Sequence, residues 1–373
     1  MKILIVGGTF TDNIETVRPS GVVNKMHEHL LDINAFSHCI SVELVNGRLI
    51  NTMESLTNAP VEKDIDLTIW MPDITNEEAK HYPHKKQGSV LICSKVMREG
   101  YTRVDSVSRI FKMHGNAVIE IRKCMETNKY TFCLVDALAN VWYEGDNIPA
   151  LMTSIMAFVG FTRAARRVNT TRGCEVYVPT EKYFNDNRDN LQKLLDINRK
   201  LQHHIKTACG DRFFGNVSTR CQKLFPSARA NEVSVEYTQD TMYVSPRNTD
   251  KESLTPEDMV LYFGNNDVYF GEKKPSVDSP AQARLYKKLP GISFMIHGHA
   301  TIVLNNIQTT KHYKLCGDIN EVDEVIKVVG TDAKWFAINL LGHGFLIGAD
   351  TPETLESVVN SLIDEAGFKI TNQ

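Results

Sequence analysis

Residues 294–303 read Phe-Met-Ile-His-Gly-His-Ala-Thr-Ile-Val, an apolar run that contains two histidines. On a β-strand the side chains at positions i and i+2 point to the same face, so His297 and His299 are expected to lie side by side. A third histidine, His343, stands between two glycines after the apolar run 335–341. Three imidazoles hold a zinc ion and leave one position for substrate, as catalytic zinc sites do. We therefore predict a Zn²⁺ site here; the alternative is hydrogen-bonded core and turn histidines.

The carboxylate expected beside this metal is Asp278, in the run KPSVDSP at 274–280. Ser279 suits the N-cap of a helix and Pro280 its first turn, so Ser276 and Asp278 are expected in a tight loop just before a helix. Such a helix N-terminus favours an anion. Asp278 then ligates the metal or moves a proton on carbon; the alternative is that it only completes the cap and complements the helix dipole.

Two further polar loops supply candidate substrate-binding residues. The run GNVSTR at 215–220 pairs a turn with hydroxyl residues that can donate to an oxyanion, and an arginine in the run SPRNTDK at 245–251 can pair with a phosphate or carboxylate. Each run by itself is also common in solvated turns. The predicted substrate-binding residues are Asn216, Ser218, Ser245, Arg247, Asn248 and Ser276.

Residues 1–165 alternate apolar, strand-like runs with helix-length polar segments. This alternation is typical of βαβ units with a mainly parallel sheet, so we predict a Rossmann-like open sheet. The apolar run 150–161 is expected to be a core helix or strand. The strand candidates are 2–6, 39–45, 66–70, 89–93, 117–121 and 131–135.

The first strand candidate leads into a glycine turn at Gly7 and Gly8, and a first helix is expected to open near residues 19–26. Open α/β sheets bind nucleotides at such turns. The fingerprint G-x-G-x-x-G is absent, and the glycines alone are explained equally well by a tight turn. The residues expected to contact a nucleotide or phosphate are Gly7, Gly8, Thr9, Ser20 and Lys25.

The second half of the chain has a different pattern. Residues 166–189 follow a polar, basic stretch and are predicted to be a linker or junction. Residues 190–373 are predicted to form a second domain, and the order of its elements suggests an α+β arrangement or three layers, α/β/α. Its expected elements are helices at 187–207 and 281–289, strands at 233–238, 241–245, 259–263, 268–270 and 294–303, and a terminal strand and helix.

Composition excludes several classes of protein. The chain has 373 residues, 42% of them hydrophobic, enough for about two or three cored domains. With 42 Lys+Arg against 45 Asp+Glu there is no global basic field for nucleic acid or membrane binding. No apolar run reaches the roughly twenty residues that span a bilayer, no secretory signal is evident, and the eight cysteines form no C-x-x-C pair. We expect a cytoplasmic protein with a small-molecule substrate, no membrane association and no nucleic-acid partner.

Over about residues 190–373 the motifs resemble, in order, those of the class II aldolase/adducin family, which includes fuculose-phosphate aldolase and ribulose-phosphate 4-epimerase. The motifs are GNVSTR, SPRNTDKESLTPEDMV, KPSVDSPAQARLY, IHGHA and LLGHGFLIGADTPETLE. The resemblance implies zinc held by His297, His299 and His343, and substrate near Asn216, Arg247 and Ser276. It also implies a homotetramer with sites at subunit interfaces.

The motifs depart from the aldolase pattern in places. Family aldolases carry Glu where this chain has Asp278, whereas the 4-epimerase branch carries Asp. The phosphate loop differs at Pro246-Arg247-Asn248, and Val277 replaces a second serine. No tyrosine follows Tyr313 to serve as the catalytic tyrosine of some members.

The function predicted is a zinc-dependent lyase that cleaves or forms a C–C bond in a sugar, sugar phosphate or sugar-nucleotide through a metal-stabilised enediolate. The alternatives are a 4-epimerase of a ketose phosphate with the same metal site, a non-catalytic adducin-like scaffold, and a nucleotide-dependent ligase acting through the first domain. Residues 1–30 faintly resemble the nucleotide-binding domain of phosphopantothenoylcysteine synthetase, which makes a nucleotide the candidate ligand of that domain.

Overall fold

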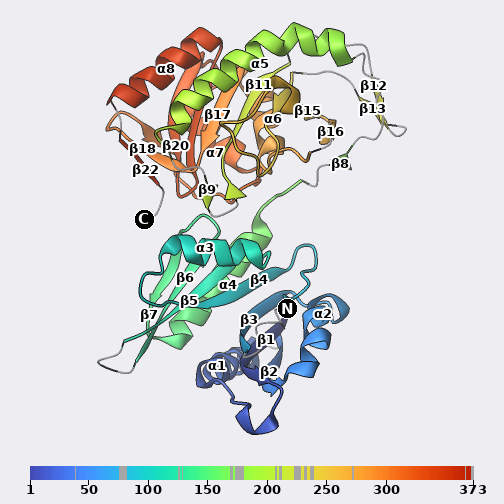
Figure 1. The fold of residues 1–373 in the computed structure, drawn as a ribbon, viewed down its shortest axis with the longest axis vertical. Helices are drawn as coiled ribbons and strands as arrows, with labels where there is room; N and C mark the ends of the chain where they lie inside the picture. Colours follow the sequence, from blue (N-terminus) through green and yellow to red (C-terminus); the bar gives the residue numbers. More distant parts are fainter. Residues whose placement is uncertain are drawn as a thin grey trace. The chain divides into compact units, whose positions relative to one another are not determined.

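The chain divides into two compact units, Met1–Ala164 (unit 1) and Ala165–Thr371 (unit 2), in the computed structural model shown in Figure 1. The structure describes residues 1–37, 39–74, 82–124, 127, 129–168, 171–172, 180–205, 208–209, 212–221, 228–230, 233–235, 239–270, 273–365 and 367–370.

Unit 1 is built on a sheet with the strand order β2-β1-β3-β4-β5-β6-β7. The strands from β2 to β5 are parallel neighbours, and β6 and β7 are added antiparallel at one edge. Parallel strands that are buried on both faces need continuous apolar sequences, and the first-half strand candidates have them. The predicted mainly parallel sheet is confirmed. Its strands are β1 (Lys2–Thr11), β2 (Ser41–Leu49), β3 (Leu67–Ile74), β4 (Val90–Val96), β5 (Ala117–Lys123), β6 (Tyr130–Asp136) and β7 (Val141–Gly145).

Helices cover both faces of this sheet because side chains alternate along each strand. Ile3 and Ile5 of β1 pack with α1 (Gly21–Ser37) and α4 (Ile148–Ala164). Leu4 and Val6 pack on the other face, with α2 (Met53–Glu62) and α3 (Arg103–Lys112). The apolar run 150–161 is therefore a core helix, within α4.

The first strand is longer than the sequence predicts. It continues past Val6 through Gly7 and Gly8 to Thr11, so the two glycines lie within β1 and not in a turn after it. Gly7 lets α1 pack closely on the strand, since a Cβ at this position would lie 2.3 Å from Cγ2 of Val23.

Unit 2 is built on a mainly antiparallel sheet with the order β19-β20-β21-β17-β11-β14-β15-β16-β8. Its strands are β8 (Thr171–Arg172), β11 (Asn216–Arg220), β14 (Thr241–Val244), β15 (Val260–Phe263), β16 (Val268–Phe270), β17 (Phe294–Gly298), β19 (Gln308–Thr309), β20 (Trp335–Leu340) and β21 (Gly344–Ala349). Short pairs outside this sheet are β9 (Ala208–Cys209) with β10 (Arg212–Phe213), β12 (Ala228–Ala230) with β13 (Val233–Val235), and β18 (Ala300–Val303) with β22 (Gly367–Ile370).

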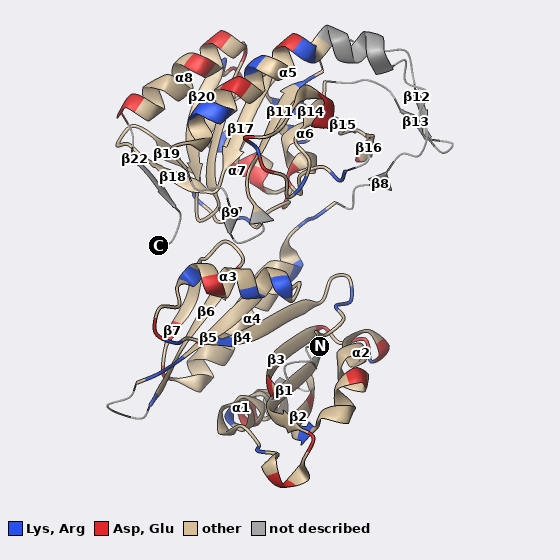
Figure 2. Ribbon diagram, viewed as in Figure 1, with Lys and Arg blue, Asp and Glu red and all other residues tan. Residues whose placement is uncertain are grey.

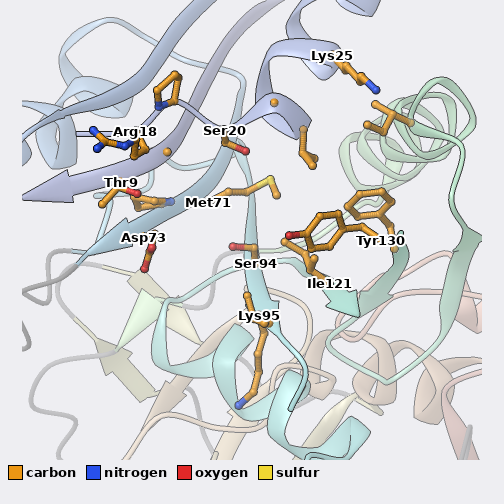
Figure 3. A pocket seen from close by; sticks show the side chains of 18 of the residues that line it. Thr9, Arg18, Ser20, Lys25, Met71, Asp73, Ser94, Lys95, Ile121 and Tyr130 are labelled. Atoms are coloured by element: carbon orange, nitrogen blue, oxygen red, sulfur yellow. The ribbon is translucent and has the colours of Figure 1, made fainter. Parts of the chain in front are cut away.

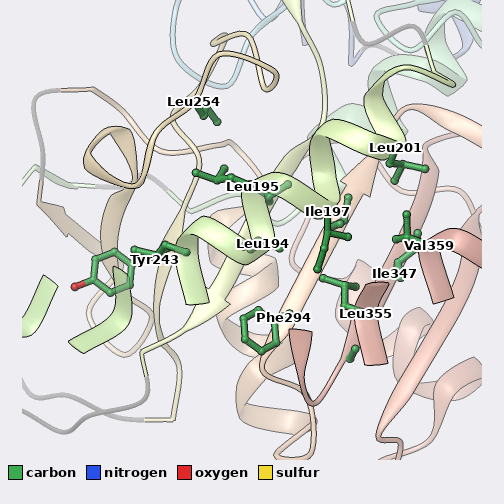
Figure 4. Close-up of a cluster of buried hydrophobic side chains, with 14 of the residues drawn as sticks. Leu194, Leu195, Ile197, Leu201, Tyr243, Leu254, Phe294, Ile347, Leu355 and Val359 are labelled. Carbon is green, nitrogen blue, oxygen red and sulfur yellow. The ribbon is translucent and has the colours of Figure 1, made fainter. Parts of the chain in front are cut away.

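Two helix layers enclose the unit 2 sheet and confirm the predicted α/β/α architecture. On one face, α5 (Thr180–Gln202) and α8 (Pro352–Glu365) bury a cluster that Figure 4 shows, with Leu194 and Leu355 near Phe294 and Ile347. On the other face, α6 (Ser279–Lys288) and α7 (Glu321–Val329) pack on apolar side chains of the same strands.

The exposed side of α5 carries both signs of charge and that of α8 carries acidic residues (Figure 2), and ion pairs connect the two helices. Lys193 Nζ lies 2.9 Å from Glu353 Oε1, and Lys200 pairs with Glu356. These pairs are half-exposed, so each is expected to contribute little to stability. The apolar contacts beneath them hold this layer.

Two expected elements differ from the structure. The run 294–303 is not one strand: β17 ends at Gly298, the chain bends at His299, and β18 pairs with β22 outside the main sheet. The helix expected at 187–207 begins earlier, at Thr180, and ends at Gln202. No helix within the described ranges combines the length and apolar character needed to cross a bilayer.

Gly7→Ala tests the close packing of α1 on β1. The added methyl group would overlap the fully buried Val23, so the free energy of unfolding is expected to fall by about 1–3 kcal/mol. Gly21→Ala is the matched control, because no atom lies within 4 Å of a Cβ built there. Urea unfolding of both variants checks this, and equal stability of the two would contradict it.

Candidate metal and acid–base site

The three predicted histidines meet at one end of the unit 2 sheet. His297 is the second-to-last residue of β17, His299 lies at the bend before β18, and His343 lies in the turn between β20 and β21. Their ring centroids are 4.8 to 5.2 Å apart, and one nitrogen of each lies within 4.8 Å of the others. His297 and His343 are buried, and His299 is half-buried.

Glycines allow the backbones that carry these histidines to approach. Gly344 has a φ of +144°, and a Cβ there would lie 2.0 Å from the carbonyl oxygen of Gly298. Gly215 has a φ of +76°, and its Cβ would lie 2.4 Å from the carbonyl oxygen of His297. Both conformations favour glycine. Gly344 therefore lets the turn that carries His343 lie close to the backbone of Gly298.

Hydrogen bonds orient two of the rings toward a common point. Nδ1 of His297 lies 2.8 Å from the carbonyl oxygen of Phe345, so Nδ1 carries the proton and Nε2 the lone pair. That Nε2 is buried, and no described residue forms a hydrogen bond with it. Nδ1 of His343 lies 2.6 Å from Oε1 of Glu321. A carboxylate or carbonyl behind the ring is the usual support of a metal-binding histidine.

The surroundings set the charges of the rings. Burial lowers the pKa of His297 to about 4, and burial holds the pKa of His299 well below its usual value, with neighbouring imidazoles acting in the same direction. Both rings are therefore neutral at pH 7 and keep a lone pair. Burial also lowers the pKa of His343, but Glu321 and Cys316 outweigh it and raise that pKa well above its usual value.

Two residues that sequence reasoning missed lie against His343. They are Glu321, at the start of α7, and Cys316, whose Sγ lies 3.3 Å from Nε2 of His343. Cys316, Asp278 and His343 form a second group with ligand atoms within 4.8 Å of one another. Neither residue stands in a motif with metal-ligand spacing, so no local signal identifies them.

Asp278 faces the histidines and does not cap the helix. It occupies the N-cap position of α6, where Ser279 was expected, but its side chain makes no cap hydrogen bond. Instead Oδ1 accepts from the backbone N–H of Gly317 at 2.7 Å, and Oδ2 accepts from Nδ2 of Asn216 at 3.2 Å. Oδ2 lies 3.8 Å from Nε2 of His297.

Asn216 and Ser276 support the same carboxylate. Nδ2 of Asn216 also donates to Oγ of Ser276 at 3.1 Å, and Oδ1 of Asn216 accepts from Gln282. Ser245 lies behind them: its Oγ accepts from the N–H of Val217 at 3.2 Å. Asn216, at the start of β11, and Ser276, in the loop before α6, thus both contact the Asp278 carboxylate.

The other predicted substrate residues lie further out. The hydroxyl of Ser218 lies 3.1 Å from that of Tyr286, within the buried packing of α6. Arg247 is exposed, and its backbone N–H donates to Lys274 at 2.8 Å. Asn248 has a φ of +53° and accepts through Oδ1 from the N–H of Phe213 at 2.9 Å. Phe214, which follows Phe213 in the sequence, stacks on His299 with ring centroids 5.1 Å apart.

The residues predicted for nucleotide contact are all in unit 1. Gly8, Thr9, Ser20 and Lys25 line one cavity, whereas Gly7 does not and contacts α1 instead.

A buried lysine adds positive charge near the histidines. Lys251 is only 1% exposed, and its Nζ donates to the carbonyl oxygen of Thr249 at 2.6 Å. Burial lowers the pKa of Lys251 to about 8, and its charge in turn lowers the pKa of His297 and His299.

Lys251→Met tests this burial. The pKa falls from 10.5 to about 8 on folding, so the unfolded chain binds more protons between these pH values and wild-type stability rises with pH there. Relative to the variant, the wild type is expected to gain about 2 kcal/mol of unfolding free energy between about pH 7.5 and 9.5. Urea unfolding at both pH values measures it. A difference in stability that does not change with pH would contradict burial of the charge.

Several solved structures are similar to unit 2 at low identity. YgbL from Klebsiella pneumoniae is 13% identical over 48% of this chain and 86% of its own, with a TM-score of 0.34. An L-fuculose 1-phosphate aldolase from Glaciozyma antarctica PI12 is 14% identical over 50% and 76%, with a TM-score of 0.33. The N-terminal class II aldolase domain of a Thermoplasma acidophilum protein is 13% identical over 47% and 92%, with a TM-score of 0.33.

A family model identifies unit 2 more directly. The model described as "Class II Aldolase and Adducin N-terminal domain" matches residues 192–353. This range contains the three histidines, Asp278 and the strands that carry them. By this match, residues 192–353 of unit 2 are identified as a domain of the class II aldolase and adducin family.

Proposed function

We propose that unit 2 is a zinc-dependent lyase of the class II aldolase type, acting on a sugar, sugar phosphate or sugar-nucleotide. The observation that carries the proposal is the convergence of three imidazoles around a buried Nε2 of His297 that has no hydrogen-bond partner in the part of the chain that the structure describes. A buried acceptor without a partner costs free energy, and a metal ion would satisfy it.

The donor set fits a catalytic zinc ion. His297, His299 and His343 would hold it, and three protein nitrogens leave room for a substrate oxygen. The neutral state of His297 and His299 suits ligation, because protonated imidazole cannot bind a metal. Glu321 would orient His343 from behind, as a carboxylate does in many zinc sites.

A bound divalent ion would polarise the carbonyl of a chelating ketose or aldol, so that negative charge builds on oxygen as a C–C or C–H bond breaks. Asp278 is the group that takes or returns the proton on carbon. Its two oxygens are held by Gly317 and Asn216, so the carboxylate cannot rotate away from the space beside His297.

The runner-up is a 4-epimerase with the same metal and carboxylate. It is favoured by one feature, an aspartate at position 278 where family aldolases carry glutamate. The two reactions differ in whether the product keeps the mass of the substrate. The non-catalytic scaffold fits less well, because the metal ligands and the hydrogen bonds that orient them are all present.

Metal analysis tests the site. The purified full chain is expected to contain about one zinc ion, and His297→Ala and His343→Ala are each expected to lose it, since two remaining imidazoles bind zinc weakly. His204→Ala, at an exposed histidine, is the control that should retain it. Circular dichroism of each variant shows whether it is still folded, so that loss of metal is not mistaken for unfolding. A folded wild type that takes up no divalent ion on addition would sink the proposal.

Asp278→Asn tests the acid–base role. The variant is expected to keep its metal but lose about 10²- to 10⁴-fold in kcat on whichever ketose phosphate the wild type converts, because amide nitrogen accepts no proton. Asp364→Asn, at an exposed position on α8, should retain wild-type kcat. Mass spectrometry of the products separates cleavage from epimerisation. An unchanged kcat in Asp278→Asn would remove this residue from the mechanism.

A further inference from the structure

The cavity in unit 1 lies far along the chain from the histidines and is not explained by the chemistry of unit 2. Its volume is about 1120 Å³, slightly above the range of about 300–1,000 Å³ that is usual for small-molecule sites. Figure 3 shows Thr9, Ser20 and Ser94 around the side chain of Met71, with Tyr130 across the cavity from Thr9.

The topology of the sheet places this cavity where a crevice must form. β1 is flanked by β2 on one side and by β3 on the other, so the connections after β1 and β3 leave the sheet in opposite directions. Open α/β sheets bind ligands outside the carboxyl ends of their strands at such a switch point. Gly8 and Thr9 of β1, Asp73 of β3 and Ser94 of β4 all line the cavity from these ends.

The wall is strongly cationic. Acidic lining residues are Asp73 and Asp146, whereas the basic lining residues are Arg18, Lys25, Lys95, Arg98, Arg109 and Lys129. The chain as a whole carries a net charge of −3, so this excess is local. A concave site lined by one sign of charge concentrates ligands of the opposite sign.

The basic residues form two groups at different places on the wall. Arg18 and Lys25 lie near the start of α1. Ser20 directly precedes this helix, and its Oγ lies 3.4 Å from the backbone nitrogen of Val23. The second group comes from β4, α3 and the start of β6. There Lys95 lies 3.9 Å from Asp105 and over the ring of Tyr101.

The loop beside α1 is held in place by backbone contacts. The N–H of Thr9 donates to the carbonyl oxygen of Arg18 at 2.7 Å, and the N–H of Ser20 donates to Oδ1 of Asn46 at 2.7 Å. A loop fixed in this way loses little conformational freedom when a ligand binds. The first N–H groups of α1 favour phosphate at the same place.

The remaining wall is apolar and aromatic. Met71, Ile121, Tyr130 and Phe132 line the cavity from β3, β5 and β6. Aromatic and aliphatic side chains pack against a planar heterocycle, whereas they make no favourable contact with an inorganic anion.

We propose that unit 1 binds a nucleoside polyphosphate in this cavity. The phosphates lie between the start of α1, with Ser20 and Lys25, and the second basic group, with Arg109, and the base lies against the wall that carries Tyr130. The proposal uses residues of unit 1 only, so its test does not depend on the lyase activity proposed for unit 2.

Isothermal titration calorimetry of the full chain at low salt tests the proposal, with ATP and CTP as probes. At least one is expected to bind, and Lys25→Glu and Arg109→Glu are each expected to weaken binding at least about tenfold, which is about 1.4 kcal/mol. Lys112→Glu is the matched control: it makes the same charge change on α3 outside the cavity and should leave the Kd unchanged. His297→Ala should also bind normally.

Other outcomes would overturn the proposal. Tripolyphosphate binding as tightly as either nucleotide would show that the base is not recognised. Equal weakening by Lys112→Glu would show only general charge attraction, and loss of binding in His297→Ala would move the ligand to unit 2. Absence of heat and of a thermal shift with both nucleotides at millimolar concentration would remove the site altogether.

Discussion

The pairing of β17 between β11 and β21 is the constraint on which the site in unit 2 depends. Its register sets His297 opposite Asn216 on one side and opposite Leu346 on the other. Asn216 then reaches Asp278, and the start of β21 brings His343 beside His297. A shift of one residue in either pairing would turn His297 to the opposite face of the sheet. Backbone hydrogen bonds of a central strand thus position both the candidate ligands and the candidate base.

The buried histidines differ in protonation, although they lie close together. Burial keeps His297 and His299 neutral, and Lys251 adds to this effect, whereas Glu321 draws a proton toward His343. A metal ion placed among them would therefore meet two ready lone pairs and one ring that must release a proton. Burial raises the pKa of the Cys316 thiol beside His343, so this thiol would also have to release a proton before its sulfur could bind a metal.

The two units use the same layered plan in different ways. In unit 1 a parallel sheet sends its strand ends to one edge, so a cavity at that edge collects polar and basic side chains from many connections. In unit 2 an antiparallel sheet carries the histidines at the end of its central strand and in the adjoining turns, and the helix start at Asp278 completes the group. The two sheets accordingly support two different proposals, anion binding for unit 1 and metal-assisted proton transfer for unit 2.

The sequence by itself determined the alternation of strands and helices in the first half, the division into two domains and the set of three histidines. These features depend on local periodicity and on short motifs. The ends predicted for β1 and α5 were wrong, and β17 and β18 were predicted as one strand. The sequence does not show whether Gly7 and Gly8 continue a strand or form a turn, nor that the chain bends at His299. Only the tertiary structure turned Asp278 away from its helix, set Glu321 and Cys316 against His343 and buried Lys251. The physical reason is that burial and long-range hydrogen bonds are created when distant segments pack, and no stretch of chain contains them in advance.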